Sequence, residues 1–419
     1  MHIVMLSDIE TLGGAAVAAS RLATGLCQAG HRVTRVVWRE DAETHPWETY
    51  VLKNWRKSNP AKRIIRKMVP SRLQNRWNKQ DSIRTLQKAL SRILLRLSPD
   101  VINLHNLHGA AGAGWTHGLA QVCAELAPTV WTLHDMWSIT GRCAYNYDCR
   151  KFITGCDSTC PTPTEYPALE PQLIAQAWED RRRIFDACPN LTIVSPSRWL
   201  ANEAISGLWQ KHRIEVIPYG LPLDIYRPLD RAMARAALGV ETTGPVLLVA
   251  AQNLVERRKG GTFLVDALQA VSHQPLTIVT LGNGRLQFEN NGLGVHDLGY
   301  VDHERTRVLA YNAADLFVHP APVDNLPNVV MEAIACGTPV VGFPIGGVPE
   351  MVRPGLTGWL AEEVSSNALA KTIDRAIRDL NVNSCRKYCR AVAESDYRVE
   401  QQAQRYIELF ASMQVPSKY

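Results

Sequence analysis

The sequence predicts an α/β protein with two parallel-sheet layers, each covered by helices. Short apolar runs alternate with helix-compatible stretches along most of the chain. Most of these runs end at polar or small residues, where open parallel sheets place their ligands. A proline-containing stretch near residues 220–240 separates two such series. We therefore expect a first domain at residues 1–222, with 396–419 packing back on it, and a second at 223–395.

The first series starts with an apolar run at residues 2–7. A glycine-containing loop at 11–15 and a helical stretch at 16–29 follow, and the helix stops at Gly30. This strand–loop–helix order is the start of a parallel layer. We expect the other strands of the first layer at residues 33–38, 101–104, 129–133 and 191–194.

The second series repeats this alternation after residue 240. Its expected strands lie at residues 246–251, 276–281, 316–319 and 339–343. Helical patterns lie between them, for example at 261–270 and 305–314. A last amphipathic pattern at 397–413 is predicted to cross back onto the first layer.

The composition is that of a globular chain, with 46% hydrophobic and 21% charged residues among 419. It excludes a disordered chain, a collagen-like repeat and a small disulfide scaffold. No stretch reaches the roughly 18 unbroken apolar residues of a membrane-spanning helix. The first residues lack a basic region and a long apolar core, so we expect no secretory signal, a cytoplasmic protein and mostly reduced thiols.

The positive charge is concentrated in residues 53–96, which hold 14 basic residues and one acid, Asp81. From Ile83 onward apolar residues recur every three or four positions, which favours an ordinary core helix with a solvated basic face. Upstream, tryptophans accompany the basic residues and favour an anionic surface. We expect peripheral contact with the inner face of the cell membrane, and no nucleic acid, since no recognition module accompanies the charge.

The most informative stretch is residues 319–341, which carries two acids eight positions apart. Asp324 is predicted in a loop before a helix, and Glu332 about two turns further along. Backbone N–H groups at the helix start, including those of Asn325 and Leu326, favour a diphosphate. Glu332 is then placed to accept hydrogen bonds from vicinal hydroxyls. Taken singly, either acid could instead be a helix cap or a solvated side chain.

This stretch resembles the signature of family 4 glycosyltransferases, Glu-x7-Glu followed by Ala-Met-Ala-Cys-Gly-Thr-Pro-Val-Val. Asp324 replaces the first Glu of that pattern. The resemblance implies the GT-B fold, in which two Rossmann-like domains face each other across a cleft and a C-terminal helix crosses back. It also implies that Glu332 holds the ribose of the donor and that Asp324 holds hydroxyls of the donor sugar.

Other parts of the second series match the family in the expected order. The run at residues 257–261 resembles a Lys-Gly step whose cations neutralise the diphosphate leaving group, which assigns Lys259 and Arg258 to that role. Leu254 stands where the commoner pattern has an arginine. Gly282 resembles the glycine at which the nucleotide approaches the backbone.

In the first domain, Gly13 and Gly14 match the family's glycine loop, which lets the backbone approach the donor phosphate and the acceptor. The loop lacks the Gly-x-Gly-x-x-Gly fingerprint, so a nicotinamide cofactor is disfavoured. His105, His108 and His134 follow two expected strands. The resemblance places His134 beside the donor sugar, and we expect His105 and His108 on the acceptor side.

Residues 130–143 and 323–327, with four nearby cysteines, look like colanic-acid-type exopolysaccharide glycosyltransferases. The implied reaction is retaining transfer of a sugar from a UDP- or GDP-type nucleotide-sugar to a glycan or lipid-linked acceptor. Asp324, His134 and Lys259 are the expected catalytic residues. No Asp-x-Asp motif occurs, so we expect neither a catalytic divalent metal nor another cofactor.

Four cysteines crowd into one short segment, at Cys143, Cys149, Cys156 and Cys160. Four close thiols can hold a structural Zn²⁺ in tetrahedral geometry. The spacing lacks the paired Cys-x2-Cys form, so reduced or disulfide-paired thiols are equal alternatives. In each case we expect the cysteine cluster to hold the loop after His134 in place.

Two other functions fit the same fold. A sugar-nucleotide epimerase with the GT-B architecture would bind a nucleotide-sugar but need no second acceptor. A catalytically silent, glycosyltransferase-like binding subunit would account for Asp324 and Leu254, the departures from the family pattern. Product analysis separates these alternatives from a transferase.

Overall fold

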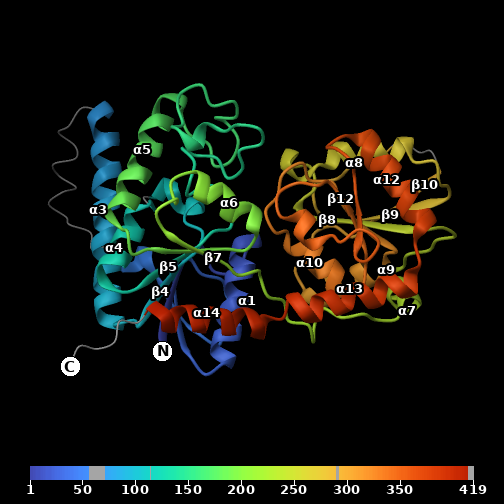
Figure 1. Cartoon of the computed structure of the whole chain (residues 1–419), viewed down its shortest axis with the longest axis horizontal. Helices are drawn as coiled ribbons and strands as arrows, with labels where there is room; N and C mark the ends of the chain where they lie inside the picture. The colour runs from blue at the N-terminus through green and yellow to red at the C-terminus, as the bar shows by residue number, and fades with distance from the viewer. Residues whose placement is uncertain (56–70, 114, 289–291, 414–419) are drawn as a thin grey trace. The chain divides into compact units, whose positions relative to one another are not determined.

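The computed structural model describes residues 1–55, 71–113, 115–288 and 292–413 (Figure 1). The chain divides into two compact units. The first unit contains Met1–Pro196, Leu200–Ile217 and the chain from Ala403 onward. The second unit contains Ser197–Trp199 and Pro218–Gln402.

The first unit is built on a seven-stranded parallel sheet with the order β3-β2-β1-β4-β5-β6-β7. Its strands are β1 (His2–Ile9), β2 (Arg32–Arg39), β3 (Glu48–Val51), β4 (Val101–Leu104), β5 (Thr129–Thr132), β6 (Thr192–Ser195) and β7 (Arg213–Val216). Because β2 and β4 flank β1, the chain turns away from β1 in opposite directions, as in a Rossmann-like sheet.

Helices cover both faces of this sheet (Figure 1). They are α1 (Gly14–Gln28), α3 (Ser71–Leu97), α4 (Gly118–Leu126), α5 (Pro171–Ala187), α6 (Arg198–Ser206) and α14 (Val399–Met413), with the 3₁₀-helices η1 (Leu52–Trp55), η3 (His108–Ala113) and η4 (Lys151–Ile153). The C-terminal helix α14 buries Tyr406 and Phe410 in the core that includes Ile3 and Val130. The predicted return of the C-terminal helix to the first sheet is therefore confirmed.

The second unit is built on a six-stranded parallel sheet with the order β10-β9-β8-β11-β12-β13. Its strands are β8 (Val246–Asn253), β9 (Leu276–Asn283), β10 (Leu293–Asp297), β11 (Leu316–His319), β12 (Val340–Gly342) and β13 (Gly358–Leu360). Its helices are α7 (Arg231–Leu238), η5 (Arg257–Lys259), α8 (Gly261–Ala270), α9 (Glu304–Ala313), α10 (Asn328–Ala335), α11 (Val348–Met351), α12 (Ser366–Asp379) and α13 (Val382–Asp396). Leu247 and Leu316 pack with Leu264 and Leu369 in its core.

The basic segment predicted for membrane contact lies partly outside the described residues, at 56–70. In the described part of α3, the apolar stripe is buried at Leu86, Leu90 and Ile93, as expected for a core helix. The basic residues between them are exposed, at Arg84, Lys88, Arg92 and Arg96. Among the described helices none is both long and apolar enough to cross a bilayer.

Candidate functional site

The second sheet has a point where its chain direction reverses, between β8 and β11. The strand that follows β8 in the chain, β9, lies on one side of this point, and the strand that follows β11, β12, lies on the other side. In parallel α/β sheets the loops that leave two such strands diverge, and ligands bind at the carboxyl ends of the strands there. The short helix η5, which carries Arg258 and Lys259, follows β8. Asp324 follows β11.

Lys259, Asp324 and His319 meet at this edge of the sheet. The Nζ of Lys259 donates to the Oδ2 of Asp324 at 2.9 Å, and the Nε2 of His319 lies 3.7 Å from the same oxygen. Asp324 is buried, and burial by itself would raise the pKa of its carboxyl. The charges of Lys259 and Arg258 outweigh burial and hold the pKa of Asp324 well below its usual range. Asp324 is therefore an ionised acceptor at neutral pH.

His319 is a site residue that the sequence did not assign. Burial lowers its pKa to about 4, so its imidazole is neutral at physiological pH. Its buried Nε2 has no hydrogen-bond partner in the described part of the chain. The sequence did contain an indication of this role. His319 ends an apolar strand, and the argument that selected His134 from its place after a strand would also have selected His319.

The loop after Asp324 is held by close backbone packing. Ser197 donates its hydroxyl to the Oδ1 of Asn325 at 2.6 Å, and the N–H of Gly347 donates to the Asn325 carbonyl at 2.8 Å. Gly346 has φ 53°, and a Cβ there would lie 1.8 Å from the carbonyl oxygen of Asp324. A side chain at position 346 would therefore displace the backbone that carries Asp324.

Helix α10 begins directly after this loop. Its N-cap, Pro327, gives no side-chain hydrogen bond, so the first helical N–H groups lack a side-chain cap. Leu326 is buried just before the helix. An uncapped helix start attracts an anion such as a phosphate.

Glu332 lies on α10 and is 4% exposed. Tyr311 of α9 donates its hydroxyl to the Oε2 of Glu332 at 2.9 Å. Arg307 of the same helix is close enough that the Glu332 carboxylate raises its pKa, although burial opposes that shift. No sequence pattern indicated Tyr311 or Arg307, because the spacing of residues within α9 does not show which helix α9 faces.

Two other residues assigned to the donor side, Arg258 and Gly282, belong to the same unit, as does Leu254. Arg258 contacts Glu256 at 2.5 Å. Leu254 is buried in the core of the second unit, so its side chain takes no part in a charged site. Gly282, at the end of β9, has φ 150°, and a Cβ there would lie 2.0 Å from the carbonyl oxygen of Ala251.

The first unit has its own reversal point, between β1 and β4. Gly13 is the N-cap of α1, with φ 97°, and Gly14 is the first helical residue. The helix starts without a side-chain cap, which leaves its N-terminus suited to an anion. Asp8 of β1 accepts from the N–H of Gly109 at 2.6 Å, next to His108.

The three predicted histidines gather at this edge. The Nδ1 of His105 lies 3.1 Å from the Nε2 of His134, so one ring donates to the other. Burial holds the pKa of His105 well below its ordinary value and lowers that of His134 to about 4. His108 contacts Asp135 through Nε2 at 2.7 Å and the hydroxyl of Tyr166 through Nδ1 at 3.0 Å.

The four clustered cysteines lie in the connection between β5 and α5. All ten cysteines of the chain are free thiols in the structure. Within the described residues, no three of the clustered sulfurs lie within 4.8 Å of one another. The structure therefore shows neither a disulfide nor a closed metal site among them.

Comparison with known proteins identifies the family. The family model described as Glycosyltransferase Family 4 matches residues 12–225, and the model described as Glycosyl transferases group 1 matches residues 244–379. The glycosyl transferase WcaC of Escherichia coli K12, named for colanic acid biosynthesis, is 28% identical over 63% of this chain and 65% of its own length. A D-inositol 3-phosphate glycosyltransferase of Catenulispora acidiphila is 35% identical over 40% of this chain and 44% of its own length. The matched regions thus span less than two thirds of these relatives.

Solved structures show the same fold over nearly the whole chain. Sucrose-phosphate synthase from Thermosynechococcus elongatus has a TM-score of 0.70 at 20% identity, covering 98% of this chain and 100% of that one. HepE of Anabaena, solved in complex with UDP-glucose, has a TM-score of 0.68 at 19% identity, with 98% and 100% covered. The predicted architecture of two Rossmann-like domains, the GT-B fold, is confirmed.

Proposed function

We propose that this chain, which belongs to glycosyltransferase family 4, transfers a sugar from a nucleotide-sugar to a hydroxyl acceptor with retention of anomeric configuration. The observation that carries the proposal is the Lys259–Asp324 pair at the reversal point of the second sheet. A partly buried cation near an uncapped helix start suits a diphosphate leaving group. A buried, ionised carboxylate beside it suits the hydroxyls of the transferred sugar.

In this mechanism Lys259 and Arg258 stabilise the charge that develops on the departing diphosphate, together with N–H groups near Asn325 and Leu326. Asp324 and His134 orient the sugar, and Glu332 accepts the ribose hydroxyls. Gly13 and Gly14 let the backbone approach the phosphates. The protein supplies positive charge through its own side chains, so we propose that transfer needs no divalent metal.

We propose a UDP- or GDP-type hexose donor and a lipid-linked oligosaccharide acceptor used in the assembly of a cell-surface polysaccharide. The naming of WcaC for colanic acid biosynthesis and the solution of HepE with UDP-glucose support this choice. We propose peripheral contact with an anionic bilayer through residues 53–96, which hold 14 basic residues and one acid. Failure of the protein to sediment with anionic vesicles at low salt would remove the membrane part of the proposal.

The test is thermal stabilisation by UDP- and GDP-sugars in EDTA, for the wild type and Glu332→Ala. A ligand that binds only the folded chain raises its melting temperature. We expect a shift with one base class in EDTA, and a smaller shift in the variant. No shift with any donor contradicts the proposed site. Binding without transfer to any acceptor favours the silent subunit, and a new sugar-nucleotide without acceptor favours the epimerase.

A further inference from the structure

The connection between β5 and α5, residues 133–170, is long and carries little regular structure. Only the single turn of η4 lies within it among the described elements. Loops of more than about 15 residues without secondary structure are uncommon in compact domains unless something fixes them. Here the connection begins at His134 and Asp135, which contact His105 and His108. Its conformation therefore matters for the site.

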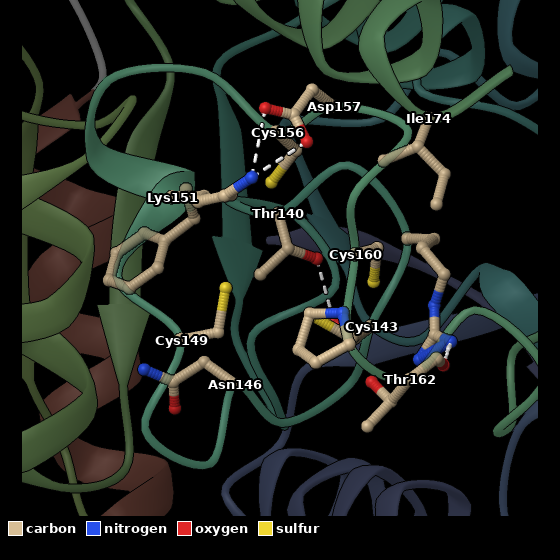
Figure 2. A pocket seen from close by; sticks show the side chains of 13 residues that line it. Thr140, Cys143, Asn146, Cys149, Lys151, Cys156, Asp157, Cys160, Thr162 and Ile174 are labelled. Carbon is tan, nitrogen blue, oxygen red and sulfur yellow. Dashed lines mark hydrogen bonds and ion pairs between the residues drawn. The ribbon is translucent and has the colours of Figure 1, made fainter. Parts of the chain in front are cut away.

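The four clustered cysteines line one pocket enclosed by this connection. Figure 2 shows Cys143, Cys149, Cys156 and Cys160 standing around it, from different parts of the loop. The carboxylate that lines the pocket, Asp157, is paired with Lys151 at 2.8 Å. Sulfur is thus the ligand type that this pocket offers.

Two buried arginines lie beside these sulfurs without a carboxylate partner in the described part of the chain. Arg181 is 5% exposed and donates to the carbonyl oxygens of Trp137, Gly141 and Ala177.

Arg142 is 3% exposed and donates to the Thr162 carbonyl, while its Nε has no partner. A buried cation without a compensating anion is costly. Thiolates bound to a metal ion would supply that anion. The two buried arginines are an observation independent of the clustering of the thiols.

We propose that Cys143, Cys149, Cys156 and Cys160 bind one structural Zn²⁺ that fixes the β5–α5 connection. A tetrathiolate zinc centre carries a net charge of about −2, which the two buried arginines offset. The N–H of Gly141 already donates to the Sγ of Cys156 at 3.1 Å, a contact of the kind that stabilises a thiolate ligand.

Binding requires the side chains to turn inward. Zinc–sulfur bonds of about 2.3 Å bring tetrahedral sulfurs to about 3.8 Å from one another. No three of these sulfurs lie within 4.8 Å of one another in the structure, so the site closes only on the ion. Each thiol that ligates gives its proton to solvent.

The experiment measures metal in the full chain rather than activity. We expect about one zinc per chain by elemental analysis of protein purified without chelator. After the metal is stripped under reducing conditions, Co²⁺ should give the near-ultraviolet thiolate charge-transfer bands and the intense visible bands of a tetrahedral site. Absence of these bands from the stripped wild type overturns the proposal, whatever the variants do.

Variants test the ligands one by one. Cys143→Ser and Cys156→Ser should each lose most of the zinc, while Cys27→Ser, in the same unit but outside the pocket, should retain it. If the control variant Cys27→Ser loses as much zinc as Cys143→Ser and Cys156→Ser do, the assignment of the ligands is contradicted. Alkylation of the unreduced chain with mass analysis is the last arm, because two disulfides among the four cysteines also overturn the proposal.

Discussion

Lys259 and Asp324 form an ion pair of 2.9 Å although 65 positions separate them in the chain. Each follows a different strand, and the two strands are neighbours in the sheet. The pair exists because parallel strands bring their carboxyl ends to one edge. It links the leaving-group side of the proposed reaction to the sugar side.

Replacing Lys259 by alanine removes the cation that we propose stabilises the leaving diphosphate, and it removes the ion-pair partner of Asp324. We expect Lys259→Ala to lower kcat/KM for transfer by at least about 100-fold, as does loss of one group that stabilises developing charge. The matched control is Lys371→Ala, an exposed lysine of α12, which should keep nearly wild-type activity. Steady-state kinetics with the donor identified by thermal shift provide the measurement. Equal losses in both variants would contradict a specific role for Lys259.

Gly346 packs closely against the backbone of Asp324 in the same site. A Cβ at 346 would lie 1.8 Å from the Asp324 carbonyl oxygen, whereas one at Gly355 would have nothing within 4 Å, and both residues have positive φ. Both substitutions carry the cost of a positive φ, and only Gly346→Ala also creates a steric clash. We therefore expect Gly355→Ala to lower the free energy of unfolding by about 1 kcal/mol and Gly346→Ala by about 3 kcal/mol.

The clash at position 346 should weaken donor binding as well as lower the stability of the fold. Isothermal titration with the nucleoside diphosphate should show weaker binding for Gly346→Ala and unchanged binding for Gly355→Ala. Similar urea unfolding curves for the two variants would show that the loop accommodates the methyl group, and would contradict the tight packing at Asp324.

His134 lies in the first unit, so its loss should affect transfer and spare the nucleotide. We expect His134→Ala to lower kcat by at least about 10-fold, in the range for a positioned group near the reacting atoms. Affinity for the free nucleoside diphosphate should stay within about twofold, because the proposed phosphate and ribose contacts come mainly from the second unit. A variant that loses nucleotide affinity and keeps kcat would place His134 outside the catalytic centre.

The sequence predicted the interior strands of both sheets and missed the edge strands. β3 and β7 end the first sheet, and β10 and β13 end the second. β7, with the sequence Arg-Ile-Glu-Val, shows why, since its residues are half-exposed or exposed and two are charged. Edge strands face solvent and lack the continuous apolar run that marks a buried strand.

The same limit applies within the site. Asp324 and Glu332 are recognisable because one loop and one helix carry both, at a fixed spacing. Tyr311, which donates to Glu332, comes from a different helix, and only tertiary packing brings the two together. Pairings between elements depend on which faces meet, and the periodicity of one element does not contain that information.

His319 makes stability depend on pH in a defined direction. Its pKa falls from 6.5 to about 4 because burial disfavours the imidazolium. Between these values the unfolded chain binds more protons than the folded chain, so the free energy of unfolding rises with pH there. This contribution is complete above about pH 6.5 and is lost as the pH falls towards 4. A shift of this size is worth up to about 3 kcal/mol.

Calorimetric unfolding between pH 7 and about 4.5 measures this contribution, and Asp324 titrates below that range because its pKa is held low. Buried His105, His117 and His134 of the first unit, whose pKa values are also lowered, act in the same direction. The variant His319→Gln should therefore flatten the pH dependence of the second unit and leave that of the first. His273→Gln, which changes an exposed histidine of the second unit, should keep the wild-type slope. If His319→Gln keeps that slope too, burial does not lower the pKa of His319 in the folded chain, which contradicts the prediction.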